Sequence, residues 1–196
     1  MFSKGEIRAA LDGSWLLFRN RPEGMAFFDQ SIQGFWRSFG VVFLLVPAFL
    51  VSGLTDKKLY FLQNMYHPDA FPDLAFWLAQ SLGLAIDWLT LPLLLAALAA
   101  PIGISQRYVP FIVARNWTSL LTTLPYFAIY FLFLIGIFNA EIAVFLSLLL
   151  LPVIIWYRYL VARIALQSSI SLAIGIVVLD VVLTLLISEV TGHLWK

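Results

Sequence analysis

Two aspartates stand inside long apolar stretches of this chain, where a carboxyl group is costly to place. Asp87 is the only formally charged residue between Leu74 and Ala100. A helix over that stretch reaches roughly 40 Å, which exceeds the roughly 30 Å hydrocarbon core of a bilayer. Asp180 has a similar central position in the apolar stretch 168–188. Because a carboxyl group near the midplane costs on the order of 3 kcal/mol or more, each aspartate must face protein or a wet cavity.

Other polar side chains share the helical stripes of these two aspartates. Gln80 and Thr90 fall on the same face as Asp87, and Thr184 falls on the same face as Asp180. Long polar side chains inside a span pack against other helices rather than against lipid. These five residues are therefore the first candidates for a polar site within the bilayer.

A third apolar stretch, 118–138, supplies further hydroxyl groups. Tyr130 lies about 18 Å along it, close to the depth of both acids. We expect at least one aspartate to accept a hydrogen bond from Tyr130, Thr90 or Thr184. Since no Lys or Arg is predicted at that depth, burial should keep both carboxyl groups neutral.

Two roles are open for such carboxyl groups. A neutral carboxyl can donate one hydrogen bond and hold two helices together for about 1 kcal/mol. The same group, when water reaches it, can load and release a proton or bind a substrate. A wet cavity that reaches both Asp87 and Asp180 would favour the second role, whereas sealing by helix contacts would favour the first.

The sequence contains no recognisable catalytic motif, so we expect no enzyme. The residues around Asp87 and Asp180 lack the Tyr-Asp and Gly-x-Gly-Asp patterns of intramembrane aspartyl proteases. A serine protease needs a histidine near its serine, but His67 and His193 are predicted outside the apolar stretches. The chain has no cysteine, no Gly-rich phosphate loop and no metal-ligand spacing. We therefore expect no cofactor and no metal site.

The elements that carry these residues are predicted to be membrane-spanning helices. Hydrophobic residues make up 62% of the 196 residues and charged residues 12%, whereas a soluble domain has about 25% charged residues. The net charge of +1 gives no reason to expect a nucleic-acid partner. We predict an all-α polytopic transmembrane helical bundle, a single integral membrane domain over 1–196. Its five predicted spans are 38–54, 74–100, 118–138, 142–163 and 168–188.

The remaining segments are predicted to lie at the membrane surfaces. An apolar stripe that includes Ile7, Trp15 and Phe18 predicts an N-terminal amphipathic helix, either interfacial or packed against its own domain. A second interfacial helix is predicted from Met25 into the first span, so that 1–37 forms the cytoplasmic surface layer. The segments 55–73 and 101–117 are predicted as connections, with Asp73 capping the second span.

Basic residues predict the orientation of the bundle. Nine lie on the side of the N-terminus and three on the other side, which places the N-terminus in the cytoplasm and the C-terminus outside, in a bacterial inner membrane. Arg37, Arg115, Arg158 and Arg163 are expected at the cytoplasmic interface, too far from the two aspartates to pair without a deep water-filled inlet. The nine residues are Lys4, Arg8, Arg19, Arg21, Arg37, Arg107, Arg115, Arg158 and Arg163, and the three are Lys57, Lys58 and Lys196.

In length and topology the chain resembles the Ypt-interacting-protein (Yip) family of small five-span membrane proteins and its prokaryotic relatives. The resemblance covers nearly the full chain, and it assigns no residue a role. It implies a membrane scaffold or assembly and adaptor subunit without catalysis, with the lipid bilayer, other membrane proteins or a second copy as partners. The alternative is a small proton-coupled transporter or permease subunit that uses Asp87 and Asp180.

Overall fold

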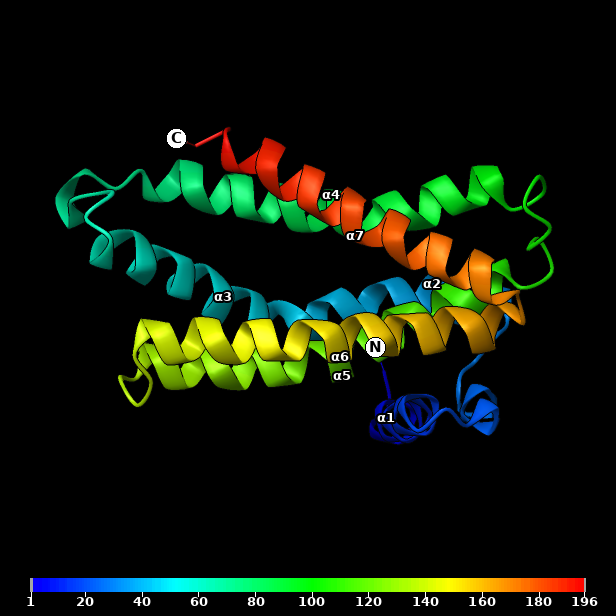
Figure 1. The fold of residues 1–196 in the computed structure, drawn as a ribbon. Helices are drawn as coiled ribbons and strands as arrows, with labels where there is room; N and C mark the ends of the chain where they lie inside the picture. Colours follow the sequence, from blue (N-terminus) through cyan, green and yellow to red (C-terminus); the bar gives the residue numbers. More distant parts are fainter. Residues whose placement is uncertain (1, 196) are drawn as a thin grey trace.

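The computed structural model describes residues 2–195, and these form only helices and the connections between them (Figure 1). Five helices are long and apolar enough to cross a membrane, which confirms the predicted class. The α-helices are α1 (Lys4–Phe18), α2 (Ile32–Ser38), α3 (Val42–Leu62), α4 (Asp73–Leu98), α5 (Tyr108–Leu134), α6 (Ala140–Leu166) and α7 (Ile170–Gly192), and the 3-10 turns are η1 (Pro22–Phe27), η2 (Phe39–Val41) and η3 (Pro68–Ala70).

The helices extend beyond the predicted apolar stretches. The first candidate span covers Ile32–Leu62, because α2, η2 and α3 follow one another without a break. The prediction of a connection over 55–73 is therefore wrong for its first part. The prediction of a connection over 101–117 is wrong from Tyr108, where α5 begins. In both places the charged side chains favour a loop when the sequence is considered alone, yet Asp56, Lys57, Lys58 and Arg115 lie on helices and have partners.

The prediction that Asp73 caps the second span is wrong. Pro72 occupies the N-cap position of α4, and Asp73 is the first helical residue. The Asp73 carboxylate forms an ion pair with Lys57 of α3, so it joins two helices instead of capping its own. Lys57 also lies 4.9 Å from the centre of the Phe71 ring, which anchors the 63–72 connection to the end of α3.

Helix α1 packs against the bundle, one of the two arrangements that the sequence left open. It is seen nearly end-on in Figure 1, whereas the spans run across the picture. Ala10, Ser14 and Leu17 are buried, and the hydroxyl of Tyr157 on α6 donates a hydrogen bond of 2.7 Å to the Ser14 carbonyl oxygen. Trp15, in contrast, is half exposed.

The second helix, predicted to run from Met25 into the first span, begins only at Ile32 and continues through η2 into α3. Residues Pro22–Phe27 make a 3-10 turn, and the chain then runs extended until Ser31 caps α2. The backbone N–H of Ser31 donates to the Asp29 carboxylate at 3.1 Å. This local turn, together with a side-chain hydrogen bond from the same serine, lowers the pKa of Asp29 below its usual value. Turn chemistry thus overrides the apolar stripe that predicted a helix here.

The spans form two groups. Helices α4 and α7 lie side by side in one group, and α3, α5 and α6 form the other, with α1 beside α5 and α6 (Figure 1). Helix α4 has few close approaches to α3 and α5, whereas α7 also contacts α6. We call the end that holds the 99–107 connection and the α6–α7 turn the N-terminal side, and the opposite end the C-terminal side.

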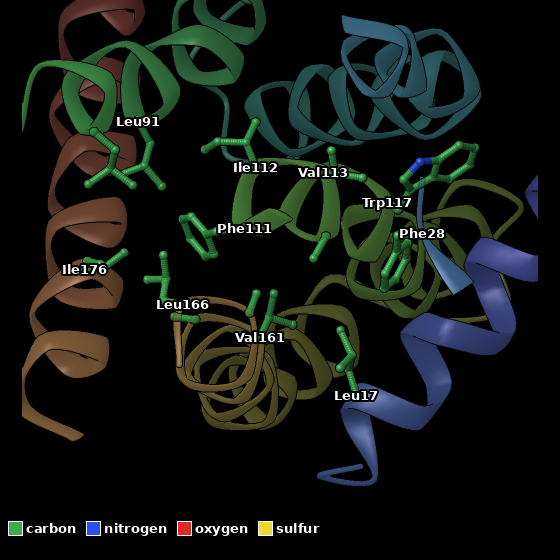
Figure 2. Close-up of a cluster of buried hydrophobic side chains, with 14 of the residues drawn as sticks. Leu17, Phe28, Leu91, Phe111, Ile112, Val113, Trp117, Val161, Leu166 and Ile176 are labelled. Atoms are coloured by element: carbon green, nitrogen blue, oxygen red, sulfur yellow. The ribbon is translucent and has the colours of Figure 1, made fainter. Parts of the chain in front are cut away.

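The hydrophobic core lies on the N-terminal side, around α5. Figure 2 shows Phe111 of α5 between Leu91 of α4, Ile176 of α7 and Leu166 of α6. Leu17 extends the same buried cluster to α1. Between this core and the middle of the spans, polar side chains lie where the two helix groups approach each other.

Candidate functional site

A cavity of about 180 Å³ lies between the two groups of helices. Both predicted aspartates, Asp87 and Asp180, line it together with Arg115 and Arg158. The cavity therefore combines two acids and two bases in a part of the protein that is otherwise apolar. Hydroxyl groups complete its polar wall: Thr118, Ser119, Thr122, Thr123 and Tyr157.

Asp180 is the centre of a buried ion cluster. Arg115 of α5 donates to one of its carboxylate oxygens at 3.1 Å, and Arg158 of α6 donates to the other at 2.7 Å. Asp180 is only 7% exposed. The prediction that no base lies at the depth of the acids is therefore wrong, and with it the reason to expect a neutral carboxyl at Asp180. Two arginines on one carboxylate leave the cluster with a formal charge of +1.

Helix geometry explains how the two arginines reach Asp180. Arg115 lies about 10 Å along α5 from its start at the N-terminal side, and Arg158 lies about 12 Å before the end of α6 on that side. Asp180 lies about 15 Å along α7, and the long arginine side chains span the difference. The predicted position of both arginines at the cytoplasmic interface is therefore wrong: α5 begins ten residues before the predicted third span, and Arg158 lies inside the predicted fourth span and not at its end.

The other two arginines predicted at the interface lie at the N-terminal side. Arg37, in the last turn of α2, forms an ion pair with Glu6 of α1. Arg163 is in the last turn of α6, where a cation is favoured by the helix dipole. Neither residue lines the cavity.

Asp87 has a different environment from Asp180. The hydroxyl of Thr184 donates to its carboxylate at 2.7 Å, which joins α4 to α7. This hydrogen bond confirms the expectation that a hydroxyl would meet one of the aspartates. Within residues 2–195, no Lys, Arg or His forms an ion pair with Asp87. Thr184 lies one turn after Asp180 on α7. Asp180 and the hydroxyl that bonds Asp87 therefore share one polar face of α7.

The remaining predicted residues lie elsewhere. Thr90 donates to the carbonyl oxygen of Ile86 within its own helix. Gln80 donates to Asp56 of α3 at 3.1 Å, and Tyr130 lines a second cavity together with Asp56. The structure thus brings together Asp87, Asp180 and Thr184, and separates them from the other three candidates.

The hydroxyl groups of α5 present oxygen lone pairs to the cavity. Thr118, Ser119 and Thr122 each donate their proton to a backbone carbonyl three residues earlier, at 3.1, 2.6 and 3.1 Å. Arg115 and Arg158 each have five N–H donors, of which one each bonds to Asp180. The cavity therefore offers charged donors and neutral acceptors to a small polar molecule.

Among residues 2–195, the charged cavity holds only two acidic side chains, Asp87 and Asp180, and no histidine. Within the described part of the chain, no three His, Asp or Glu side chains come close enough to hold a metal ion. The chemistry of the cavity comes from guanidinium, carboxylate and hydroxyl groups.

Together, the fold and the cavity define an all-helical membrane protein with five spans and a charged cavity between two helix groups. Comparisons of the chain with protein-family models, curated proteins and solved structures gave no match. The resemblance to the Yip family therefore remains a prediction from length and topology.

Proposed function

We propose that this protein is a small membrane transporter or permease subunit that binds an anionic solute in the charged cavity. The observation that carries the proposal is that Asp87, Asp180, Arg115 and Arg158 all line one cavity. Charges inside a span are costly, and they typically mark a pathway for ions or substrates. A purely structural contact between helices is made more cheaply by apolar packing, since a buried ion pair contributes little net stability.

Charge balance indicates how the cavity accepts an anion. With both acids ionised, two aspartates and two arginines sum to a formal charge of zero. An entering carboxylate or phosphate group competes with Asp180 for the guanidinium groups, which bind such groups through paired hydrogen bonds. If Asp87 takes up one proton at the same time, the cavity stays neutral. Asp87 is suited to this role because, within residues 2–195, it bonds to the uncharged Thr184 hydroxyl and pairs with no cation.

The division of the bundle supports a moving part. The acids lie on α4 and α7 and the arginines on α5 and α6, so the ion cluster bridges the two helix groups. A solute that replaces Asp180 on the arginines weakens this bridge. Relative movement of two helix groups around a central site is the usual basis of alternating access.

The proposal includes the orientation. Lys4, Arg8, Arg19, Arg21 and Arg107 all belong to the segments of the N-terminal side, and an excess of basic residues favours the cytoplasm. Arg115 and Arg158 no longer count toward this excess, because they lie inside the bundle. We place the N-terminus in the cytoplasm and the C-terminus outside, in a bacterial inner membrane.

A scaffold or adaptor subunit without catalysis is the second candidate. It is favoured by the ties that the polar groups make between helices, from α7 to α5 and α6 through Asp180 and from α4 to α7 through Asp87. In that role the cavity needs no ligand, and the partner is another membrane protein or a second copy. The two candidates differ in whether a small anion binds.

Anion binding is tested by thermal unfolding of the purified protein in detergent. The probes are L-lactate, succinate, L-glutamate and inorganic phosphate, each added as the sodium salt at matched ionic strength. We expect at least one to raise the midpoint temperature saturably, because a ligand of the folded state alone stabilises it by mass action. The shift should be lost in Arg158→Gln and kept in Arg163→Gln, the matched control outside the cavity. No shift with any probe would contradict the proposal and favour the scaffold.

A further inference from the structure

A second cavity, of about 150 Å³, lies between α3, α5 and α6 and shares no lining residue with the charged cavity. Most of its wall is apolar, but four of the residues that line it have side-chain oxygen atoms. They come from all three helices. The four residues are Thr55 and Asp56 of α3, Tyr130 of α5 and Ser147 of α6.

Asp56 brings a carboxylate that has no cationic partner within residues 2–195. It accepts a hydrogen bond of 3.1 Å from the uncharged Gln80 amide. The two neighbouring lysines are engaged elsewhere. Lys57 pairs with Asp73, and Lys58 donates to two backbone carbonyl oxygens at the end of α5, at 2.7 and 3.3 Å. The negative charge of this carboxylate is therefore not balanced by any side chain that pairs with it.

Thr55 supplies an independent sign that a ligand belongs here. Thr55 is 3% exposed, and within the described residues its hydroxyl oxygen has no hydrogen-bond partner. A threonine inside a helix commonly bonds to a carbonyl oxygen one turn earlier, as Thr191 does to Ile187 at 2.7 Å. A buried hydroxyl without a partner is unfavourable, so an occupant of the cavity that it lines would complete its bonding.

The neighbouring oxygen atoms are suited to a cation. Ser147 donates its proton to the Ala143 carbonyl oxygen at 2.8 Å, and its side chain also has a hydrogen bond with Tyr130, so the two oxygen atoms lie close together. The Tyr130 hydroxyl is a further oxygen on the same cavity. Hard cations prefer oxygen ligands of this kind.

We propose that the cavity lined by Thr55, Asp56, Tyr130 and Ser147 is a binding site for one sodium ion. A single positive charge balances the single carboxylate, whereas a divalent ion leaves an excess charge in an apolar surrounding. A proton on Asp56 balances the charge but leaves the Thr55 oxygen without a partner, and a water molecule leaves the charge unbalanced. This site does not depend on the proposed transport of an anion.

The site has a structural connection to the charged cavity. Gln80, which bonds Asp56, lies two turns before Asp87 on α4, about 10 Å along the helix. Both residues fall on one face of α4. If both proposals hold, α4 contacts the ion site and the anion site at once.

Sodium binding is tested on the full-length protein in detergent by thermal unfolding, followed through the fluorescence of its 7 tryptophans. Scans in NaCl, KCl and choline chloride at equal ionic strength and fixed pH isolate the specific ion. We expect a saturable rise of the midpoint temperature with NaCl only. Equal effects of KCl or choline chloride, or no effect of NaCl, would overturn the proposal.

Four variants locate the effect. Thr55→Val keeps the shape of the side chain and removes one oxygen, so we expect the NaCl concentration for half the shift to rise tenfold or more. Asp56→Asn should abolish the shift, while Asp69→Asn, a matched change at an exposed carboxylate, should keep it. An unchanged NaCl response in Thr55→Val would overturn the assignment even if Asp56→Asn does not fold. Arg158→Gln should retain the sodium response, which separates this site from the anion site.

Discussion

At the scale of single residues, Asp180 and Asp87 have different partners although both are intramembrane acids. Asp180 is held by two arginines, and Asp87 only by a threonine hydroxyl. An acid between two cations makes two charge-assisted contacts that join its helix to two others, whereas an acid bonded to a hydroxyl makes one weaker contact. The two residues are therefore predicted to respond differently to the same substitution.

Asp180→Asn removes the negative charge that pairs with two partly buried guanidinium groups. Breaking a fully buried ion pair typically costs about 3–5 kcal/mol, and because both arginines are partly exposed we expect a smaller but clear fall in the unfolding temperature of the purified protein. Asp87→Asn is the matched change on α4. Its side-chain oxygen can still accept the Thr184 hydrogen bond, so its unfolding temperature should stay close to that of the wild type. Equal destabilisation by both variants would contradict the different roles of the two acids.

Lysine would not be equivalent to arginine at position 115 or 158. A guanidinium group can bond Asp180 and a ligand through separate N–H groups, whereas an ammonium group concentrates its charge on one atom. We expect Arg158→Lys to retain most of the fold stability but to weaken anion binding tenfold or more. The anion that shifts the wild-type unfolding temperature serves as the probe. Undiminished binding in Arg158→Lys would show that charge alone is recognised.

At the scale of elements, the attachment of α1 depends on one close approach of two backbones. A Cβ atom on Gly13 would lie 2.8 Å from both the Gly24 carbonyl oxygen and the Phe27 Cβ atom. The absence of a side chain at Gly13 therefore lets α1 dock on η1, which turns the chain back toward α2. Gly5, in the same helix, has only one neighbouring atom, at 3.9 Å.

Gly13→Ala is expected to loosen α1 and to destabilise the protein by about 1–3 kcal/mol, since the new methyl group meets backbone atoms that cannot move aside. Gly5→Ala serves as the control, because alanine favours a helix over glycine and finds open space there. Proteolysis of the N-terminal segment in detergent measures the loosening. Faster cleavage in Gly5→Ala than in Gly13→Ala would be inconsistent with this packing.

The extents of α3 and α5 show what the sequence reveals and what it does not. Apolar length alone predicts five spans, because hydrocarbon tolerates few unpaired polar groups. It also isolates Asp87 and Asp180. Arg115 and Arg158 were misplaced because the acid that pairs with them lies 65 and 22 residues away in the chain, where no local window includes it. Arg115, just before the third predicted span, and Arg158, near the end of the fourth, are the residues in the sequence that could indicate such a pair.

The second cavity was missed for the same reason. Asp56, Lys57 and Lys58 look like a loop when they are considered as a run of charges. On α3, however, helical spacing points them in three directions, to Gln80, to Asp73 and to the end of α5. Contacts between distant segments, rather than local composition, decide that these residues are helical.

At the scale of the whole molecule, an odd number of spans places the two ends of the chain on opposite sides of the membrane. The 63–72 connection and Trp195 share an aromatic cluster at the C-terminal side, where Phe76 and Trp195 lie with ring centres 5.0 Å apart. The 99–107 connection lies at the other side (Figure 1). The topology therefore predicts on which side of the membrane a reporter fused to each of these segments lies.

Reporter fusions test this topology and the proposed orientation. A reporter after Lys196, which lies outside the described residues, and one inserted in the 63–72 connection should both give an external signal. A reporter in the 99–107 connection should give a cytoplasmic signal. Signals from the same side at 63–72 and 99–107 would contradict α4 as a span, and a complete inversion would contradict only the orientation.

The central proposal is that the charged cavity takes up an anion together with a proton on Asp87. The most direct test is proton uptake in proteoliposomes that contain a pH-sensitive dye, after external addition of the anion that stabilises the purified protein. We expect internal acidification with the wild type, none with Asp87→Asn, and wild-type behaviour with the control Arg163→Gln. Acidification that is equally fast with Asp87→Asn would contradict the role of Asp87, and its absence in the wild type would contradict proton-coupled transport altogether.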